Sequence, residues 1–503
     1  MTDCNFERFC DMARAHDGTS GARVVPVWRE ILFDRDTAVS AFQRIRREPF
    51  AFLLESAPAG GETWSRYTFL GTEPSSAWRL ANGTVEEWGP NQGWHSSRRP
   101  VDPLADLESS IARVSPVNAP SLGPFWGGAV GFLGYDIVRL IEELPSPPPK
   151  SSNTPDALFI FTRCVVIIDN LRSLARIVVS VTVDDTTGLR EEFDKGMSEI
   201  ADMQSRLDNV TPLAPLRLDS SAEPAHGASS ITRADFLARV DRIKEYITAG
   251  DCFQALLSRR IEIEADFDPS SLYRALRALN PSPYMYHLVL DDVEIVGSSP
   301  ELLVRLDDSR VTLRPIAGTR PRGATAEQDR ELSEELLADP KERAEHIMLV
   351  DLGRNDVGRV ASYGTVQVTE LMKIEKYSHV LHIVSQVEGD LAQGRTPMDV
   401  IRATFPAGTM TGAPKVRAME IIDELEPVSR GAYAGAIGYI AHGGTRIDLA
   451  ITIRTCVFAD GVASVQAGAG IVADSIGENE WAETENKARA LLTAIGQVRG
   501  AAS

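Results

Sequence analysis

The stretch Asp339–Arg359, DPKERAEHIMLVDLGRNDVGR, decides how the rest of the chain is arranged. Its first residue is a typical helix N-cap, and the proline that follows strengthens the helix start. Glu342 and Glu345 lie three residues apart, so both carboxylates leave the same face of the helix. Because Ile347–Val350 is apolar on all sides, we expect burial just past the pair, where a carboxylate needs a counterion. A solvated acidic helix start that complements the helix dipole is the alternative interpretation.

A second helix near the C-terminus repeats this pattern. The segment Ser475–Val498 has an apolar stripe at helical spacing, formed by Trp481, Ala488, Leu492 and Ile495. Glu480 and Glu483 are again three residues apart, and Lys487 follows on the same face. Two helices that each carry a carboxylate pair suit a hard cation with oxygen ligands, above all Mg²⁺. We therefore predict that the two distant helices meet around one magnesium ion.

The composition limits the possible classes of function. The chain has 503 residues, 43% hydrophobic and 24% charged, as in soluble globular proteins. Its 52 Lys and Arg against 71 Asp and Glu give a net charge of −19, which argues against non-specific binding to nucleic acid or an anionic membrane. The five cysteines are scattered, which predicts a reducing compartment and no structural zinc. Without a signal-peptide or membrane-spanning pattern, the expected location is cytoplasmic.

The chain divides at residues 205–230, a segment rich in proline, serine and alanine that we interpret as a linker. Residues 1–204 form one predicted region and residues 231–503 a second, with the two halves packed closely. The second region opens with a helix over Thr232–Ala249, closed by Gly250.

The first region is expected to be rich in strands. Phe50–Glu55 and Trp64–Gly71 are predicted strands, and Leu158–Asp169 with Ala175–Val183 predicts a hairpin. The glycines of Phe125–Tyr135 do not fit the dinucleotide-binding fingerprint, so close packing of the backbone is the better interpretation.

The segment Gly431–Val472 predicts three antiparallel strands joined by Gly-Gly and Asp-Gly turns. Counting from these turns places Tyr433 opposite Arg454, and Arg454 opposite Ala467. Residues directly opposite share a face, so we expect the phenol, the guanidinium and Gly468–Gly470 together on one sheet. Such a set can bind a carboxylate. An ordinary surface arginine is the alternative, and a slip of one residue in register would separate the three groups.

Other candidate residues lie on loops and strand ends. Gln254 is carried by a predicted strand over Cys252–Ser258, and Glu301 begins a hairpin that turns at Asp307–Ser309. A lone glutamate in that position is more often a solvated strand residue than a catalyst. In Pro315–Gly323, PIAGTRPRG, the glycines and arginines would let backbone N–H groups approach an anion.

Several long motifs resemble the chorismate-utilising enzymes, and within them the large subunits of anthranilate synthase. They are PIAGTRPRG, AEHIMLVDLGRND, HVLHIVSQVEG, FPAGTMTGAPKVRAMEII and QAGAGIVADS followed by AETENKA, with LLES extending the match into the first half. The resemblance implies an α+β fold with largely antiparallel β-sheets in a β-sandwich core, flanked by α-helices. It also implies addition of ammonia to chorismate, loss of the ring hydroxyl and elimination of pyruvate to give anthranilate, the first step of tryptophan biosynthesis.

The resemblance assigns roles to individual residues. It makes Glu345 and Glu483 the Mg²⁺ ligands, with Glu342 and Glu480 supporting the metal's water shell. The enolpyruvyl carboxylate would be bound by Tyr433, Arg454, Gly468, Ala469 and Gly470. Gly318 and Thr319 match positions in the substrate loop. Lys487 matches a residue that assists with the charge of the substrate. Proton transfer is implied for Glu301, as general acid, and for His382, in the elimination, whereas His379 has no such match. Gln254 stands where water-using relatives place a lysine base, which favours ammonia as the nucleophile.

Regulation, partners and alternatives complete the expectation. Tryptophan is expected to inhibit by binding between the halves, at Leu54, Ser56, Pro283, Tyr284 and Met285, although core packing of this proline-rich loop is the alternative. The chain shows no glutaminase elbow, so ammonia would come from a separate glutamine amidotransferase subunit or from solution. Aminodeoxychorismate synthase, of the folate pathway, is a second candidate, but that relative has lysine where this chain has Ala317. A binding module without chemistry is a third candidate, which the four intact acidic residues oppose.

Overall fold

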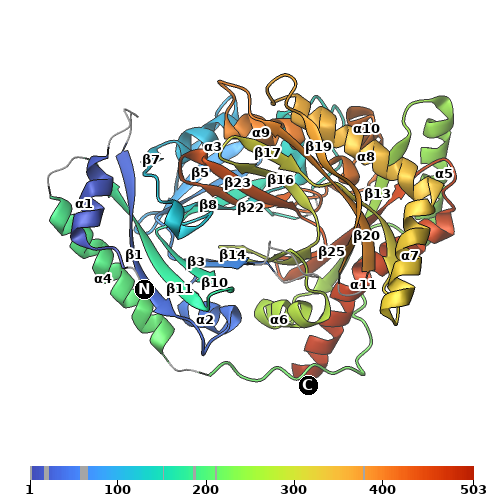
Figure 1. The fold of residues 1–503 in the computed structure, drawn as a ribbon. Helices are drawn as coiled ribbons and strands as arrows, with labels where there is room; N and C mark the ends of the chain where they lie inside the picture. The colour runs from blue at the N-terminus through green and yellow to red at the C-terminus, as the bar shows by residue number, and fades with distance from the viewer. Residues whose placement is uncertain are drawn as a thin grey trace.

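The computed structural model describes residues 3–15, 22–56, 66–150, 152–184, 188–209, 212–377 and 380–502. Two large β-sheets, antiparallel at almost every pairing, pack against each other and carry the helices on their outer faces and ends (Figure 1). The first sheet consists, in spatial order, of β12 (Ala228–Ser229), β13 (Gln254–Glu264), β25 (Val462–Ile471), β24 (Thr455–Ala459), β15 (Val293–Ser299), β14 (Tyr284–Leu290), β2 (Phe50–Glu55), β3 (Tyr67–Thr72), β10 (Cys164–Asp169), β11 (Leu174–Val183), β1 (Ala22–Leu32) and β7 (Val114–Pro116), with β21 (Gly412–Ala413) beside β13.

The second sheet faces the first across the core. In spatial order it consists of β18 (Ile316–Pro321), β20 (Val380–Asp390), β17 (Arg310–Leu313), β16 (Leu302–Asp307), β23 (Arg446–Ile451), β22 (Ala436–Ala441), β8 (Gly128–Leu133), β9 (Ala157–Phe161), β4 (Ser76–Ala81), β5 (Thr84–Gly89) and β6 (Gly93–Arg98), with β19 (Gln367–Lys376) beside β20. The helices are α1 (Phe6–Arg14), α2 (Ala38–Ile45), α3 (Pro103–Ile111), α4 (Leu189–Asp208), α5 (Arg233–Ala249), α6 (Pro269–Leu279), α7 (Ala326–Ala338), α8 (Pro340–Gly358), α9 (Pro397–Thr404), α10 (Lys415–Leu425) and α11 (Gly477–Ala502). The predicted α+β class, with antiparallel sheets flanked by helices, is confirmed.

Both sheets run across the division between the two halves of the chain. Strand β2 pairs with β14 in the first sheet, and β8 pairs with β22 in the second. Gly128 of β8 permits the contact with β22, because a Cβ there would lie 2.2 Å from the Ile440 carbonyl oxygen. Gly131 permits the close pairing of β8 with β9, because its Cβ would lie 1.9 Å from the Leu158 carbonyl oxygen. The close backbone packing predicted for this glycine-rich segment is confirmed. The two halves are thereby held in one β-sandwich.

The chain changes sheet in the middle of the predicted three-stranded segment. Strands β22 and β23 pair in the expected register, as do β24 and β25, but β23 belongs to the second sheet and β24 to the first. The crossing occurs at Thr452–Arg454, where Arg454 adopts a left-handed φ of 52°. The prediction that Tyr433, Arg454 and Gly468–Gly470 share one sheet is therefore wrong. A turn pattern fixes which strands pair, but both strands at this crossing are apolar and buried, so the pattern does not show which sheet each one joins.

Helix starts are confirmed where a cap residue marks them. The Asp339 carboxylate accepts hydrogen bonds from the N–H groups of Lys341 and Glu342, and Thr232 caps α5 while Gly250 closes it in the left-handed region. Ile347, expected to be buried, is 48% exposed on the outer side of α8. Helix α8 is buried on one side only, so an apolar residue on its other side faces solvent.

Three strand and linker boundaries need correction. The predicted strand over Leu158–Asp169 is two strands, β9 and β10, in different sheets, and only β10 forms the hairpin with β11. The strand carrying Gln254 begins at that residue and continues to Glu264. Helix α4 extends to Asp208, into the segment interpreted as a linker. Residues 64 and 65 of a predicted strand, residues 210 and 211 of the linker and His379 lie outside the described residues.

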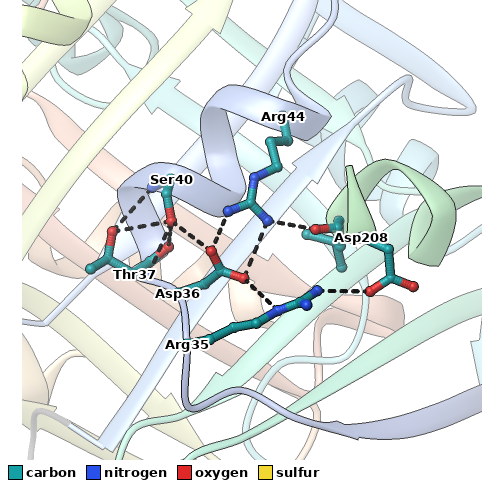
Figure 2. Close-up of polar contacts among 7 residues, drawn as sticks. Arg35, Asp36, Thr37, Ser40, Arg44 and Asp208 are labelled. Atoms are coloured by element: carbon teal, nitrogen blue, oxygen red, sulfur yellow. Dashed lines mark hydrogen bonds and ion pairs between the residues drawn. The ribbon is translucent and has the colours of Figure 1, made fainter. Parts of the chain in front are cut away.

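A group of polar side chains forms hydrogen bonds and ion pairs around the start of α2 (Figure 2). Thr37 and Ser40 form a capping box at the start of α2, and Arg44 on the helix pairs with Asp36. Arg35 extends the group to Asp208 at the end of α4, at 3.1 Å. These contacts join α2 to the end of the long helix that precedes the linker.

Candidate active site

The two acidic helix starts meet at one end of the sandwich. Glu345 on α8 is half-buried, and its pKa is raised by burial first and then by the charges of Glu342 and Glu483. Glu483 is on α11, so the two helices lie close enough for their carboxylates to repel each other. Burial also raises the pKa of Glu480, which the charge of Glu483 reinforces. The four carboxylates predicted from the sequence thus influence one another electrostatically, Glu342 and Glu483 acting on Glu345 and Glu483 acting on Glu480.

Lys487 is the cation at this meeting point. Its ammonium lies 2.7 Å from the Glu483 carboxylate and donates a hydrogen bond of 2.9 Å to the Gly468 carbonyl oxygen. The charge of Lys487 also opposes the rise in the pKa of Glu345 and of Glu301. One ammonium therefore links α11, strand β25 and both acidic groups.

A carboxylate-binding set faces these acids. Arg454 lies at the crossing between the sheets, and Tyr433 lies in the turn before β22. Burial lowers the pKa of Arg454, against the opposing effects of Tyr433 and Glu483, so the guanidinium is near both. Tyr433, Arg454 and Glu483 come from different elements. The structure nevertheless places the predicted phenol and guanidinium near each other and within electrostatic reach of the acidic helices.

The glycines of β25 expose backbone donors beside this set. The N–H groups of Leu256 and Ser258 on β13 donate to Thr411 and Glu426, so they do not bond to Gly470 and Gly468, which lie opposite them. In an antiparallel pair of this kind the N–H of each opposite residue points away from the partner strand. Strand β24 pairs with β25 only over Val462–Val465, which leaves the two glycine N–H groups at an unpaired edge among the described strands.

Glu301 is buried between β15 and β16, with 8% of its surface exposed. Burial raises the pKa of this carboxyl to about 7, while the Thr409 hydroxyl and the Lys487 ammonium act in the opposite direction. Its carbonyl oxygen accepts a hydrogen bond of 3.0 Å from the Ile451 N–H, which fixes the backbone. A carboxyl with this pKa can hold a proton near neutrality and give it to a leaving group.

His382 on β20 lies opposite Thr319 on β18. Its Nδ1 is 3.0 Å from the Gly318 carbonyl oxygen and 3.2 Å from the Thr319 hydroxyl. Since a carbonyl oxygen only accepts, Nδ1 carries the proton, and Nε2 keeps a free electron pair. Burial and the charge of Arg454 lower the pKa of the imidazole, which favours the neutral form.

Gln254 closes the site on the side of β13. The side chain is 6% exposed, and its Oε1 is buried without a hydrogen-bond partner among the described residues. Its Nε2 lies where a Cβ on Gly470 would be only 2.3 Å away, so the glycine makes room for it. An unpaired buried carbonyl oxygen can accept a hydrogen bond from an incoming N–H donor.

The acidic residues suit a magnesium ion whose remaining ligands come from elsewhere. In the part of the chain that the structure describes, no three His, Cys, Asp or Glu side chains stand close enough to hold a metal by themselves. Mg²⁺ commonly uses one or two protein carboxylates and completes its octahedron with water and substrate oxygens. Glu345 and Glu483 fit such a site, because both offer carboxylate oxygens and the two negative charges repel each other when no cation lies between them.

Two features of the site were not expected from the sequence. Thr409, in the glycine- and proline-rich loop after α9, faces Glu301. Behind Tyr433, a buried ion pair joins Arg430 to Glu426 at 2.7 Å, and Glu426 also accepts from the Ser258 N–H at 2.9 Å. The spacing of four residues between Glu426 and Arg430 was the available signal, but it does not distinguish a buried pair from a surface pair.

A cavity of about 360 Å³ lies between the two sheets. Residues of both halves line it, including all five predicted for tryptophan, Leu54, Ser56, Pro283, Tyr284 and Met285. At one end the Tyr284 hydroxyl accepts a hydrogen bond of 3.1 Å from Arg305, which also pairs with Asp448 at 2.8 Å. The cavity is large enough for an aromatic amino acid and offers both apolar and charged walls.

Comparison with known proteins agrees with this geometry. The pattern of the chorismate binding enzyme family matches residues 51–493. Anthranilate synthase component 1 of Pseudomonas putida is 48% identical over 94% of this chain and 96% of its own length, and that of Aquifex aeolicus is 45% identical over 94% of each. The crystal structure of anthranilate synthase component I from Streptococcus pneumoniae superposes with a TM-score of 0.75 at 36% identity, covering 92% of this chain and 99% of that one. The menaquinone-specific isochorismate synthase of Escherichia coli, at 18% identity and a TM-score of 0.68, shares the fold.

Proposed function

This chain belongs to the family of chorismate binding enzymes, and we propose that it converts chorismate to anthranilate as component 1 of an anthranilate synthase. The observation that carries the proposal is the meeting of three chemical groups in one place. They are the carboxylates of α8 and α11, the half-buried Arg454 facing them, and the buried Glu301 carboxyl that can hold a proton. Chorismate carries a carboxylate for each end of this arrangement and a hydroxyl for the acid.

Arg454, Tyr433 and the edge of β25 would bind the enolpyruvyl carboxylate. The guanidinium supplies charge and paired donors, and the glycine N–H groups add donors that no Cβ obstructs. Lys487 lies between the carboxylate-binding residues and the acidic helices, where its ammonium can interact with a negative charge of the substrate. A substrate held at both ends presents its ring to Glu301 and to Gln254, with water largely excluded.

In the amination half, the electron pair of ammonia forms the new C–N bond while the C–O bond to the ring hydroxyl breaks. Glu301 would donate its proton to that oxygen, so that water leaves. Gln254 cannot remove a proton from water, but its free Oε1 can accept a hydrogen bond from ammonia and orient it. In the elimination half, the free Nε2 of a neutral His382 would accept the ring proton, and the electrons of that C–H bond would complete the aromatic ring as the ether C–O bond breaks. The enolate that leaves takes up a proton and becomes pyruvate.

A divalent metal bound by Glu345 and Glu483 would neutralise the ring carboxylate and withdraw charge from the ring. Glu342 and Glu480 would hold its water shell. The donor set and the mutual repulsion of the carboxylates support Mg²⁺ as that metal.

A separate glutamine amidotransferase subunit is proposed as the source of ammonia. The relatives are named as component 1 of their enzyme, which supports a second component. We also place the enzyme in the cytoplasm, because all five cysteines are free and buried, as expected in a reducing compartment. None of the helices in the described ranges is long and apolar enough to cross a lipid bilayer.

Tryptophan is proposed as a feedback inhibitor that binds in the cavity between the sheets. The apolar lining suits an indole ring, and Arg305 with Asp448 can pair with the charged groups of an amino acid. The walls come from both halves of the chain, so an occupant would contact both.

The test is an assay of the purified chain with chorismate, ammonium salt and Mg²⁺, followed by anthranilate fluorescence. We expect anthranilate to form, to stop when the metal is chelated, and to resume when Mg²⁺ is restored. A para-substituted amino product would show the folate-pathway reaction instead, and binding of chorismate without any product would show a binding module. Glu483→Gln is the matched variant and should lose activity at all practical metal concentrations.

A further inference from the structure

Arg320 makes an unusual set of contacts for a residue outside the set of groups placed around the substrate. It lies on β18, directly after Thr319, and its guanidinium reaches three carboxylates. The distances are 3.0 Å to Glu335 at the end of α7, 3.0 Å to Asp339 at the cap of α8 and 3.2 Å to Glu342 in the first turn of α8. One side chain on β18 therefore joins the end of α7 to the start of α8.

The contact with Glu342 fixes one oxygen of that carboxylate. Oε1 accepts from Arg320, while Oε2 lies against Gly318, where an added Cβ would be 3.2 Å away. Gly318 has a left-handed φ of 64°, so its backbone also favours glycine. Glu342 is thus held between Arg320 and the bare backbone of Gly318, with one oxygen left for another donor.

Charge explains why such a contact is needed. Glu342 and Glu345 lie three residues apart on the same face of α8, so their carboxylates repel each other. Without a cation beside it, the Glu342 side chain would turn toward solvent and away from its neighbour. Arg320 offsets this repulsion, and its planar fork holds the carboxylate in one direction, which a lysine ammonium cannot do.

We propose that Arg320 is a positioning residue that aims the Glu342 carboxylate at the water shell of the metal, and that it couples this carboxylate to the substrate strand through Gly318 and Thr319. The inference rests on the proposed function, since it requires the metal. It predicts that Arg320 acts on metal affinity through Glu342, although Arg320 itself touches neither metal nor substrate.

The test measures Mn²⁺ binding to the metal-free full chain by electron paramagnetic resonance, alone and with chorismate in the absence of ammonia. Loss of an outer-shell partner typically weakens metal binding about 10- to 100-fold, and we expect this range for Arg320→Gln. Removing a positive charge by itself would strengthen cation binding, so weaker binding reports lost positioning. Arg320→Lys keeps the charge and should also bind more weakly than wild type.

Arg322 provides the matched control. It lies two residues further on and pairs with Asp329 at 2.7 Å and with the Tyr377 carbonyl oxygen at 2.6 Å, and neither partner lies on α8. Arg322→Gln should bind Mn²⁺ as wild type does, and adding Arg320→Gln to Glu342→Gln should cause no further loss. Wild-type affinity in Arg320→Gln or Arg320→Lys, or an equal loss in Arg322→Gln, would overturn the inference. Absence of Mn²⁺ binding in the wild type would instead overturn the metal in the proposed function.

Discussion

Replacing Glu301 by glutamine should stabilise the fold and remove the proton donor in one step. The carboxyl has a pKa of about 7 in the folded chain against an ordinary value of 4.5. Between these two pH values the folded state binds more protons than the unfolded state, so stability is lost as pH rises through this interval. At about 1.4 kcal/mol for each pH unit, the loss reaches about 3 kcal/mol above pH 7.

An amide of the same shape carries no charge at any pH. We therefore expect Glu301→Gln to exceed the wild type by about 3 kcal/mol in free energy of unfolding at about pH 8, and to match it at about pH 4.5. Urea unfolding at the two pH values measures this difference. Glu334→Gln, at an exposed position on α7, is the control and should change neither value.

The activity of the same variant should fall about 10²- to 10⁴-fold, the usual contribution of a positioned general acid. In the wild type the protonated fraction drops from about 0.9 at pH 6 to about 0.1 at pH 8, so kcat should fall about tenfold over this interval. The assay must hold the concentration of free ammonia constant, because that concentration itself rises with pH. Glu301→Gln with wild-type activity, or with no gain in stability at the higher pH, would refute the assignment of Glu301 as a buried acid.

The remaining predictions concern the substrate end, the cavity between the sheets and the packing of β8. Arg454→Gln should lower kcat/KM about 10- to 100-fold, the value of one charge-assisted hydrogen bond, with an unchanged melting temperature; wild-type kcat/KM would exclude Arg454 from substrate binding. Ser56→Phe should fill part of the inter-sheet cavity and raise the half-inhibitory tryptophan concentration more than about tenfold, without loss of activity when tryptophan is absent. Gly131→Ala should lower the free energy of unfolding in urea by more than about 4 kcal/mol, because the added Cβ would meet a backbone oxygen. Gly83→Ala, with open space around it, should cost only about 1 kcal/mol. Equal effects of the two substitutions would contradict the packing of β8.

Local features of the fold could be predicted from the sequence because local chemistry determines them. The start of α8 follows from an aspartate cap and a proline, and the start of α5 from a threonine cap. The register of β22 with β23, and of β24 with β25, follows from turns that require left-handed residues, seen at Gly443, Gly444, Asp460 and Gly461. From these turns alone, Tyr433 and Arg454 could be expected to lie near each other.

Features that depend on the partner of a buried strand could not be predicted. The crossing at Thr452–Arg454 and the break between β9 and β10 each fall at a few residues between two apolar, buried strands, and either strand would suit either sheet. The contact of Thr409 with Glu301 depends on how the loop after α9 folds against the start of β16, which spacing does not encode. The direction of the Glu342 carboxylate depends on Arg320, a residue on a different element that has no regular sequence relation to α8.

The segment 300–303, which contains Glu301, lines both the cavity between the sheets and a smaller neighbouring cavity. Pro300 lines the cavity between the sheets, Glu301 and Leu303 line a smaller cavity on the side of Thr409, and Leu302 lines both. The wall that this segment forms is one strand thick, and its backbone is held by the hydrogen bond from Ile451 to Glu301. A ring that filled the inter-sheet cavity would press on the residues directly before and after the acid. Because the metal ligands lie on α8 and α11 and not on this wall, such pressure would displace the proton donor before it affected the metal, and kcat would respond before metal affinity.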